Sequence, residues 1–392
     1  AETLASRKEE NEACEAAVAQ YPNPFCYTMD TSESFGLKPE GQQRDSSYQV
    51  DFNHCSCNKD EIEYLKELLS RIPAVFATHK YDLGKAKVDP IEIETTDEVP
   101  ISSKYLRIPF KVREEVRRHE QEMRNCGVMI PSNTPWVSSW VIVNKKDGTK
   151  RPCIDFRALN AKTVLDPFPI PRVDTVLEKI SGCHWYTSLD LCNGYLQIPM
   201  SKDASRKCGI ITEDGVFQMT HMPFGLKNAP GIFMRIMKEV FEGMEDFVVV
   251  YIDDILIFTK SSNFLDHLDH IQKVLLRLEE YGFKLSPKKC FFALKKVQFL
   301  GHEIWLEGYR PSELNLVAIK EFPVPTNLKQ VRSFIGMGSF FRKYIKDFAK
   351  MAEPLSRLTR SDIAFEWTQE QQDAFEAIKR ALMSRPVLVN PD

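Results

Sequence analysis

The sequence predicts an α+β protein in which a central block of short strands lies between helical segments. Two patterns support this fold class. Between Trp136 and about Phe258, short apolar runs alternate with turn residues, as they do in β-strands. After Phe264, the apolar residues recur at helical spacing instead. A composition of 43% hydrophobic and 27% charged residues is typical of globular proteins and argues against a disordered or fibrous chain.

The length of 392 residues allows two or three domains, at roughly 100–200 residues each. No apolar run approaches the roughly 18 residues of a membrane-spanning helix, and the N-terminus lacks the basic-then-apolar pattern of a signal peptide. We therefore expect no membrane association and a cytoplasmic location, in a virus-like particle or elsewhere in the cell, with the nucleus left open. The sequence does not begin with Met, which is compatible with a fragment of a longer chain.

The charge is distributed unevenly. The first 60 residues hold eleven acids and five bases, a balance of −6, so the other 332 residues carry +3 of the total of −3. A weakly positive body is compatible with nucleic-acid binding but does not establish it. Ten scattered cysteines are too few for a disulfide scaffold and fit a reducing compartment. His54, Cys55 and Cys57 have no second Cys/His pair at zinc-finger spacing, which favours a polar loop.

The N-terminal part predicts two helices after a linker. Residues 1–57 are acidic and weakly patterned, and we expect a largely flexible segment with a weak helix at 3–20. Residues 60–72 place apolar side chains on one helical face, and Pro73 ends that helix. A highly charged helix is expected at 111–126.

The central block predicts strands where apolar runs are bounded by turn residues. They are Trp140–Val143, Cys153–Phe156, Trp185–Leu189, Phe247–Tyr251 and Ile255–Phe258. Helices are expected between them at 171–180, 203–206 and 228–243.

The C-terminal third predicts mainly helices. One begins after Phe264 and has Gly282 as a plausible C-cap. A short strand is expected at 297–304, followed by helices at 327–348 and 368–383.

Two adjacent carboxylates, Asp253 and Asp254, stand between two strongly apolar runs. Only a tight turn fits between these runs, so we expect the acids at a hairpin tip. Adjacent anions resist ionisation unless a cation neutralises them, and a divalent metal with oxygen ligands is the natural cation. A solvated Asp-Asp turn is the alternative, and this pattern alone does not decide between the two.

Asp190 ends another β-prone run, which begins at Trp185. If that strand pairs beside the hairpin, three carboxylates converge. They could then hold two Mg²⁺ ions, or Mn²⁺ instead, about 3.5–4 Å apart, the arrangement for in-line phosphoryl displacement. One ion would lower the pKa of a primer 3′-hydroxyl, and the other would stabilise the leaving pyrophosphate.

At this point the chain resembles a family, because Tyr251-Ile252-Asp253-Asp254 is similar to the signature tetrapeptide of reverse transcriptases. Other segments resemble further motifs of that family in the right order. They are residues 138–152, 154–160, 188–195, 222–230 and 299–302. Together, ordered motifs are more specific than any single one. The resemblance covers about residues 80–392 and is closest to the retrovirus-like Pol polyproteins of gypsy-type LTR retrotransposons.

The resemblance implies a right-hand polymerase with fingers, palm, thumb and the start of a connection region. Its palm would be made of antiparallel strands backed by helices, of the split βαβ type. The implied boundaries follow the motifs along the chain. They are a linker at 1–57, an N-terminal extension packing on the polymerase at 58–100, fingers and palm at 101–264 with the palm hairpin at 247–258, the end of the palm and the primer grip at 265–320, the thumb at 321–360, and a connection or pre-ribonuclease H region at 361–392.

The family's catalytic roles transfer to matching positions in this sequence. Asp190, Asp253 and Asp254 would be the catalytic metal ligands. Lys145 and Arg151 border a Lys-Lys-Asp-Gly-Thr turn that suits a mobile cationic clamp on the triphosphate, although a solvated β-turn is the alternative.

The resemblance also implies contacts around the incoming nucleotide. Tyr195 would exclude the ribose 2′-hydroxyl and so select deoxynucleotides, although a Tyr beside a strand is otherwise usually a core residue. Phe224 and Gly225 would pack near the nucleotide and the template, with Gly225 permitting close backbone approach. Gly225 could equally be a plain turn residue.

Primer and template contacts are implied for Tyr251, Leu300, Gly301, Asn228 and Pro230. Without the family, Leu300-Gly301 would be an ordinary strand end. A separate basic stretch is compatible with phosphate contact or with a solvated face. It consists of Lys284, Lys288, Lys289, Lys295 and Lys296.

The expected function is RNA-directed DNA synthesis from dNTPs on an RNA or DNA template-primer, in retrotransposon replication. A catalytically silent, domesticated nucleic-acid-binding protein and an RNA-dependent RNA polymerase are the alternatives; Tyr195 argues against the latter. Ribonuclease H, protease and integrase motifs are not found in this sequence, so those activities would belong to other parts of a polyprotein. Template preference, primer identity, fidelity and a dimeric state are left open.

Overall fold

A computed structural model describes residues 49–144, 150–360 and 363–384 of the chain. The described residues fall into two compact units. The larger unit holds the residues up to Val176 and Cys183–Lys295, and the smaller unit holds Leu177–Gly182 and the residues from Lys296 onward. Within the described ranges, none of the helices combines the length and the apolar character needed to cross a bilayer.

The larger unit contains two sheets. The first has the strand order β1-β6-β5-β2-β3, in which β2 and β5 run parallel and the other neighbours run antiparallel. Its strands are β1 (Met129–Pro131), β2 (Ser138–Asn144), β3 (Lys150–Ile154), β5 (Gly209–Thr212) and β6 (Gly215–Met219). The helices of this region are α3 (Phe110–Asn125), α4 (Arg157–Lys162) and α6 (Lys202–Lys207).

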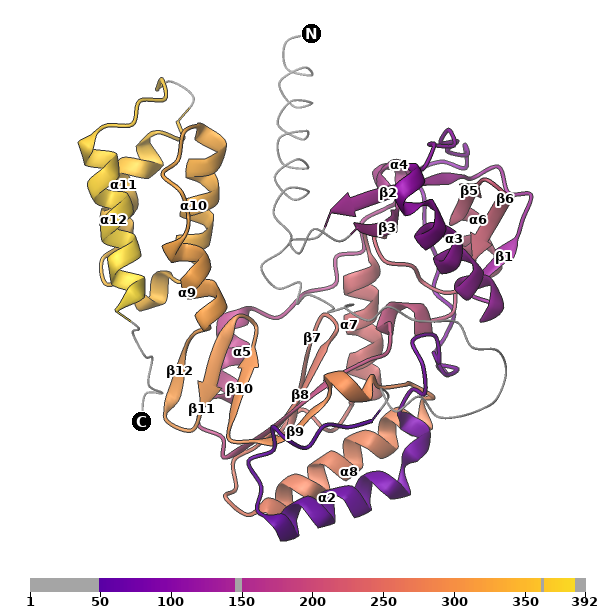
Figure 1. Ribbon diagram of the computed structural model, residues 1–392, viewed down its shortest axis with the longest axis horizontal. Helices are drawn as coiled ribbons and strands as arrows, with labels where there is room; N and C mark the ends of the chain where they lie inside the picture. The colour runs from indigo at the N-terminus through magenta and orange to yellow at the C-terminus, as the bar shows by residue number, and fades with distance from the viewer. Residues whose placement is uncertain (1–48, 145–149, 361–362, 385–392) are drawn as a thin grey trace. The chain divides into compact units, whose positions relative to one another are not determined.

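The second sheet of the larger unit has the order β7-β8-β4-β9, and all its neighbouring strands are antiparallel. Its strands are β4 (Trp185–Asp190), β7 (Val248–Tyr251), β8 (Asp254–Thr259) and β9 (Phe291–Leu294). Helices α7 (Ala229–Val240) and α8 (Phe264–Glu280) back this sheet, and α2 (Lys59–Arg71) lies beside α8 (Figure 1). The expected palm of antiparallel strands backed by helices is therefore confirmed.

The second sheet is held by an apolar core, which explains why its sequence is so rich in aliphatic residues. Ile255 and Ile257 on β8, Leu275 on α8 and Phe292 on β9 are all fully buried. Helix α8 begins where the side chain of Asn263 accepts a hydrogen bond from the Leu265 backbone N–H. The helix ends just before Gly282, whose φ of +74° suits the residue after a helix, as the sequence predicts.

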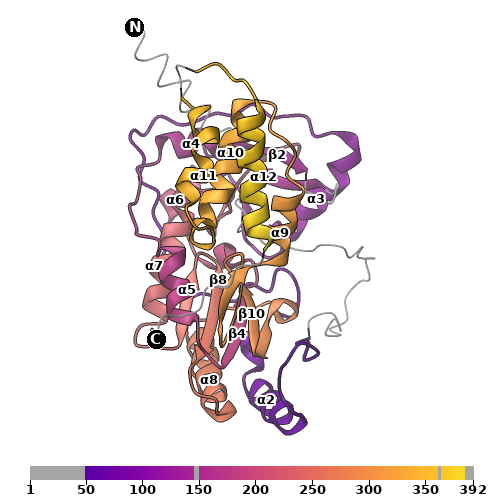
Figure 2. The ribbon, with the colours of Figure 1, turned by 90° about the vertical axis from the view of Figure 1, so that its left-hand side faces the viewer.

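The smaller unit combines a hairpin-linked sheet with a set of helices. Its sheet has the order β10-β11-β12, formed by β10 (Lys296–Phe299), β11 (His302–Trp305) and β12 (Gly308–Pro311). Its helices are α9 (Glu313–Lys320), α10 (Leu328–Phe340), α11 (Phe348–Arg357) and α12 (Gln369–Met383), and α10, α11 and α12 lie side by side (Figure 2). Phe334 and Phe375 pack together in the core, with ring centroids 4.5 Å apart.

Several short elements complete the fold. Helix α5 (Val173–Ile180) has its residues up to Val176 in the larger unit and those from Leu177 in the smaller one. The 3₁₀ turns are η1 (Pro73–Val75), η2 (Gly194–Gln197), η3 (Pro287–Lys289) and η4 (Arg342–Tyr344).

Two elements predicted from the sequence are wrong in form. The expected helix at 327–348 ends at Phe340, and Asp347, with a φ of +57°, separates it from α11. The expected single strand at 297–304 is a hairpin, because Leu300 and Gly301 both have positive φ, as a two-residue turn between right-twisted strands requires. Apolar periodicity continues through both breaks and so conceals them.

The expected linker ends earlier than the sequence suggests. Residues 1–48, including the weak helix at 3–20, lie outside the described part of the chain. Ser56 lies against β9 and the residue after it, because its N–H donates to the Ala293 carbonyl (2.9 Å) and the Lys295 N–H donates to Ser56 Oγ (3.0 Å). Val50 and Phe52 pack against the core of the larger unit. This last part of the segment is therefore fixed on the edge of the sheet.

Candidate active site

The pairing of β4, β8 and β7 brings the three predicted carboxylates together. Asp190, the last residue of β4, lies directly across from Asp254, the first residue of β8. Asp253 occupies the two-residue turn between β7 and β8, next to Ile252. The expectation that Asp190 would lie beside an Asp-Asp hairpin is therefore met in the strand register.

The hairpin tip is held in a strained conformation. Ile252 has a φ of +59°, a region that β-branched residues rarely occupy, and such strain persists only where the surroundings enforce it. The Ile252 N–H points at the sulfur of Met234 on α7, at 3.0 Å. Helix α7 thus helps to fix the turn that carries Asp253.

The local environment opposes ionisation of these carboxyl groups. Burial, followed by the charges of Asp253 and Asp190, raises the pKa of Asp254 to about 7. Burial also raises the pKa of Asp190 to about 6, against the opposing effect of Lys289. The pKa of the Asp253 carboxyl is raised as well, again mainly by desolvation. The cluster would therefore gain from a bound cation.

Lys289 supplies a positive charge at this cluster. Its Nζ lies 3.5 Å from Oδ2 of Asp190, which is long for a hydrogen bond and marks an ion pair. Lys289 belongs to η3, and the preceding Ser286 N–H donates to the Asp190 carbonyl at 2.8 Å. Sequence reasoning treated Lys289 only as one of a basic stretch, and no local signal connects it to Asp190.

The donor set suits Mg²⁺, although the carboxylates do not converge on one point. No group of three His, Cys, Asp or Glu side chains within the described ranges forms a preassembled metal site. The available donors are carboxylate oxygens, which are the ligands that Mg²⁺ prefers. Oδ2 of Asp190 is buried and accepts no hydrogen bond from the described residues, and Lys289 at 3.5 Å is its charged neighbour. The residues present therefore fit a divalent cation.

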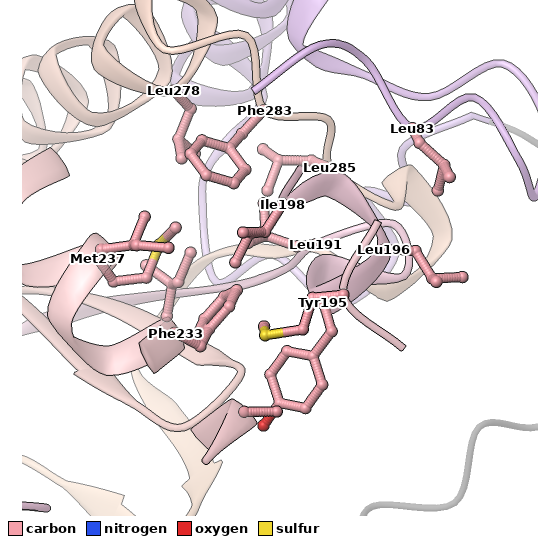
Figure 3. Close-up of a cluster of buried hydrophobic side chains, with 14 of the residues drawn as sticks. Leu83, Leu191, Tyr195, Leu196, Ile198, Phe233, Met237, Leu278, Phe283 and Leu285 are labelled. Carbon is pink, nitrogen blue, oxygen red and sulfur yellow. The ribbon is translucent and has the colours of Figure 1, made fainter. Parts of the chain in front are cut away.

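Tyr195 lies in an aromatic cluster on η2, close in sequence to Asp190. Its side chain is 7% exposed, and its ring centroid lies 5.0 Å from that of Phe224 and 5.3 Å from that of Phe233. Figure 3 shows its ring beside Phe233 within this cluster of buried side chains. Tyr195 is thus part of the core, and its role in excluding a 2′-hydroxyl stays a prediction.

The loop that carries Phe224 and Gly225 is fixed by a residue that sequence reasoning did not single out. The side chain of Asn160 donates to the Gly225 carbonyl and accepts from the Lys227 N–H, both at 2.8 Å. Gly225 has a φ of +95°, and an added Cβ would meet no atom closer than 3.7 Å. Backbone conformation, rather than crowding, therefore calls for glycine here.

The predicted triphosphate clamp is only partly described. Lys145 lies outside the described residues. The backbone of Arg151 pairs with Val143 across β2 and β3, which places it in a hairpin as the resemblance implies. The side chain of Arg151 also lies outside the description.

The predicted primer and template residues take different places. Asn228 uses its side chain to accept from the Asp166 N–H (3.2 Å) and to donate to the Val164 carbonyl (2.8 Å), so it ties a loop to the start of α7. Pro230 stands in the first turn of α7. Tyr251 ends β7 beside the carboxylates, and burial raises the pKa of its hydroxyl. Leu300 and Gly301 form the β10–β11 turn of the smaller unit.

The basic stretch is not a uniform phosphate-binding face, because most of its lysines contact protein groups. Lys284 lies 3.6 Å from Asp82, and Lys296 lies 2.7 Å from Glu303. Lys295 places its Nζ 3.1 Å from the ring centroid of Trp185. Lys289 contacts Asp190, so these four lysines each contact a different protein group.

Comparison with known proteins identifies the family of this chain. The family described as "Reverse transcriptase (RNA-dependent DNA polymerase)" matches residues 143–304, which contain all three carboxylates. The chain is 32% identical over 380 residues to the retrovirus-related Pol polyprotein from transposon 297 of Drosophila melanogaster, covering 94% of this chain and 35% of that protein. It is 31% identical over 346 residues to the corresponding polyprotein from transposon gypsy of the same organism, covering 83% and 33%. The chain thus spans about a third of the length of these relatives.

The fold is also similar to a solved structure. A foamy viral protease–reverse transcriptase in complex with an RNA/DNA hybrid aligns with a TM-score of 0.77 and 24% identity, covering 87% of this chain and 46% of that chain. At this identity the likeness concerns the fold alone, and it supports the right-hand polymerase architecture. The chain therefore belongs to the reverse transcriptase family, in the group of the Pol polyproteins of gypsy-type LTR retrotransposons.

Proposed function

We propose that this chain is an RNA-directed DNA polymerase that extends a primer 3′-hydroxyl with dNTPs in retrotransposon replication. The observation that carries the proposal is the cross-strand pairing of Asp190 with Asp254, beside Asp253, inside a reverse transcriptase domain. Three carboxylates at one sheet end are suited to phosphoryl transfer. Family membership makes this reaction preferable to other metal-dependent phosphoryl transfers.

Asp190, Asp253 and Asp254 would hold two Mg²⁺ ions, or Mn²⁺ in their place. When bound, the ions would lower the pKa of the primer hydroxyl and stabilise the charge of the triphosphate. Lys289 keeps a positive charge at Asp190 Oδ2 and so favours the ionised carboxylate that metal binding needs.

The other site residues would act on binding and selection. Tyr195 would lie under the incoming sugar and exclude a 2′-hydroxyl. Phe224 and Gly225 would contact the nucleotide and template, and Lys145 and Arg151 would hold the triphosphate. Tyr251, Asn228, Pro230, Leu300 and Gly301 would position the template-primer.

The partners proposed are an RNA or DNA template-primer and dNTPs. The foamy viral relative in fold is described in complex with an RNA/DNA hybrid, which supports the same class of ligand here. The curated relatives are Pol polyproteins about three times as long as this chain, so protease, ribonuclease H and integrase domains are proposed as its neighbours. We place the reaction in a cytoplasmic virus-like particle; a dimeric state would be a separate question for sedimentation analysis.

Primer extension on an RNA template with Mg²⁺ tests this function. Asp190→Asn and Asp253→Asn are each expected to lower the rate about a thousandfold or more, because several kcal/mol of transition-state stabilisation is lost with a metal ligand. Asp89→Asn, at an exposed position of the larger unit, is the matched control and should extend like wild type. Circular dichroism checks that every variant is folded.

Three outcomes would contradict the proposal. Near wild-type extension by a folded Asp190→Asn or Asp253→Asn protein would remove the catalytic role of the cluster. A wild-type protein that binds template-primer but adds no nucleotide would favour the silent nucleic-acid-binding alternative. A wild-type preference for ribonucleotides would favour an RNA-dependent RNA polymerase.

A further inference from the structure

A buried glutamine, Gln197, follows Asp190 by seven residues. It ends η2 and is 1% exposed. Its Nε2 donates to the carbonyl oxygens of Cys192 and Lys284, both at 2.8 Å, and its Oε1 accepts from the Lys284 N–H at 2.7 Å. Both N–H donors of the Gln197 amide and its carbonyl oxygen are therefore hydrogen-bonded to these two segments.

The two segments that Gln197 joins lead to the cluster. Cys192 follows Asp190 by two residues, and Lys284 precedes Lys289 by five. The segments also pair directly, since the Cys192 N–H donates to the Lys284 carbonyl (2.9 Å) and the Ser286 N–H donates to the Asp190 carbonyl (2.8 Å). Gln197 thus closes one end of a short ladder whose other end is at Asp190.

Packing leaves Gln197 little freedom to adopt another position. Its neighbours Leu196 and Ile198 are 6% and 0% exposed, and Leu191 and Leu285 form a β-bridge between the two joined segments. Figure 3 shows Leu191, Ile198 and Leu285 gathered in the same apolar cluster. In these surroundings, the Cys192 carbonyl that Gln197 satisfies would otherwise be buried without that donor.

An amide is the side chain that fits this position. A glutamate of the same shape has no donor for the two carbonyl oxygens, and it would bring a negative charge towards them. A methionine of similar volume has no donor for these carbonyl oxygens, and its thioether sulfur is only a weak acceptor. Either substitution would loosen the connection between the segment after Asp190 and the segment before Lys289.

We propose that Gln197 is a positioning residue for the metal-binding cluster. It acts through the backbone of Cys192 and Lys284, and so keeps Asp190 and Lys289 at their mutual distance of 3.5 Å. The inference rests on the proposed function, because it concerns cation binding by the same carboxylates. A side chain with only a packing role would change stability without changing cation affinity.

The test compares Gln197→Glu and Gln197→Met with wild type in the full chain. Mn²⁺ binding is measured by electron paramagnetic resonance, and primer extension is measured as kcat, KM for dNTP and half-saturating Mg²⁺. We expect both variants to bind Mn²⁺ about tenfold more weakly and to need about tenfold more Mg²⁺, as the loss of buried hydrogen bonds implies. The KM for dNTP should change less than kcat, because Gln197 does not reach the nucleotide.

Gln218→Met is the matched control. Gln218 also bonds through both ends of its amide, to Ser205 and Ser132, but in the first sheet of the larger unit. It should lose a similar amount of thermal stability and keep wild-type Mn²⁺ affinity. If Gln197→Glu does not fold, Gln197→Met carries the comparison, since it adds no charge.

The outcomes separate this inference from the proposed function. Unchanged Mn²⁺ affinity and unchanged Mg²⁺ dependence in the folded Gln197 variants would overturn the positioning role, even with an active wild-type enzyme. A wild-type protein that binds Mn²⁺ more tightly than these variants, yet extends no primer, would support the positioning role and refute the polymerase proposal.

Discussion

At the scale of a single residue, the ring of Tyr195 is held by its aromatic neighbours. It packs against Phe224 and Phe233, and the residue is 7% exposed. Burial holds the ring in place, which is what the proposed steric filter needs, because a mobile ring would yield to a 2′-hydroxyl. The core role and the selective role are therefore compatible.

Tyr195→Ala should admit ribonucleotides. We expect the ratio of kcat/KM for ribo- over deoxynucleotides to rise about ten- to a hundredfold, since a steric clash of roughly 1–3 kcal/mol is removed. Both substrates are measured on one template. Phe233→Leu is the control. It loosens the same cluster but keeps the Tyr195 ring, so it should leave the ratio nearly unchanged. An unaltered ratio in the Ala variant would make Tyr195 a core residue only.

His267 forms a buried link between two strands of the β7-β8-β4-β9 sheet. Its Nε2 lies 2.8 Å from Thr187 Oγ1 on β4, and its Nδ1 lies 2.7 Å from Thr259 Oγ1 on β8. Burial, with smaller contributions from His270 and Lys295, lowers the pKa of His267 to about 3. The folded protein therefore keeps this imidazole neutral at a pH where an unfolded chain protonates it.

The sign of the resulting pH dependence follows from linkage. Between pH 6.5, the ordinary histidine value, and about 3, only the unfolded state binds this proton, so stability is lost as the pH falls. We expect His267 to contribute up to about 1.4 kcal/mol per pH unit to the slope in this range. Urea unfolding between pH 4.5 and 6.5 should show a shallower slope for His267→Gln than for wild type. His54→Gln, at an exposed position, is the control; equal slopes for His267→Gln and wild type would refute the argument.

At the scale of elements, the edge of the β7-β8-β4-β9 sheet is contacted by a segment that precedes α2. Strand β9 pairs with β4, and Ser56 hydrogen-bonds to Ala293 and to Lys295 at this edge. An edge strand with unpaired backbone groups is a site for unwanted pairing, so this cover protects the sheet. Within the N-terminal segment, residues 49–57 thus pack on the larger unit, and residues 1–48 lie outside the described part of the chain.

Two deletions test where that boundary lies. Removal of residues 1–48 should leave stability and extension near wild type, as expected for a weakly patterned acidic segment. Removal of residues 1–57 should cost about 1–3 kcal/mol of unfolding free energy, because apolar contacts of Val50 and Phe52 and the bonds to β9 are lost. Chemical denaturation of both proteins measures the difference. Equal stability of the two would show that residues 49–57 are a linker after all.

At the scale of the whole molecule, each of the two units has its own core. In the smaller unit, Phe334, Phe375 and Ile378 are buried together. In the larger unit, Phe292 and the strands β4 and β8 form a separate core. Units with separate cores often unfold in separate transitions.

Calorimetry of core variants tests this division. Phe334→Ala should lower one transition by about 3–5 kcal/mol of unfolding free energy and leave the other in place. Phe292→Ala should do the reverse, and so serves as the control. A single transition that moves as a whole in both variants would show that the chain unfolds as one unit.

The sequence by itself determined the elements whose signal is local. The apolar runs around Asp253-Asp254 predicted the hairpin, and the boundaries of α2, α8 and α12 follow their helical periodicity to within a few residues. The identity of the three carboxylates also needed only local pattern and resemblance. Each of these features depends on neighbours within a few residues, which is the range over which a sequence pattern acts.

The tertiary structure alone decided which distant segments meet. No periodicity indicates that Lys289 lies at Asp190, that Gln197 joins Cys192 to Lys284, or that residues 49–57 cover β9. It also decided where the helix expected at 327–348 breaks. These contacts form only when folding brings remote parts of the chain within hydrogen-bonding distance. Burial then makes each hydrogen bond necessary, because a buried polar group without a partner costs free energy.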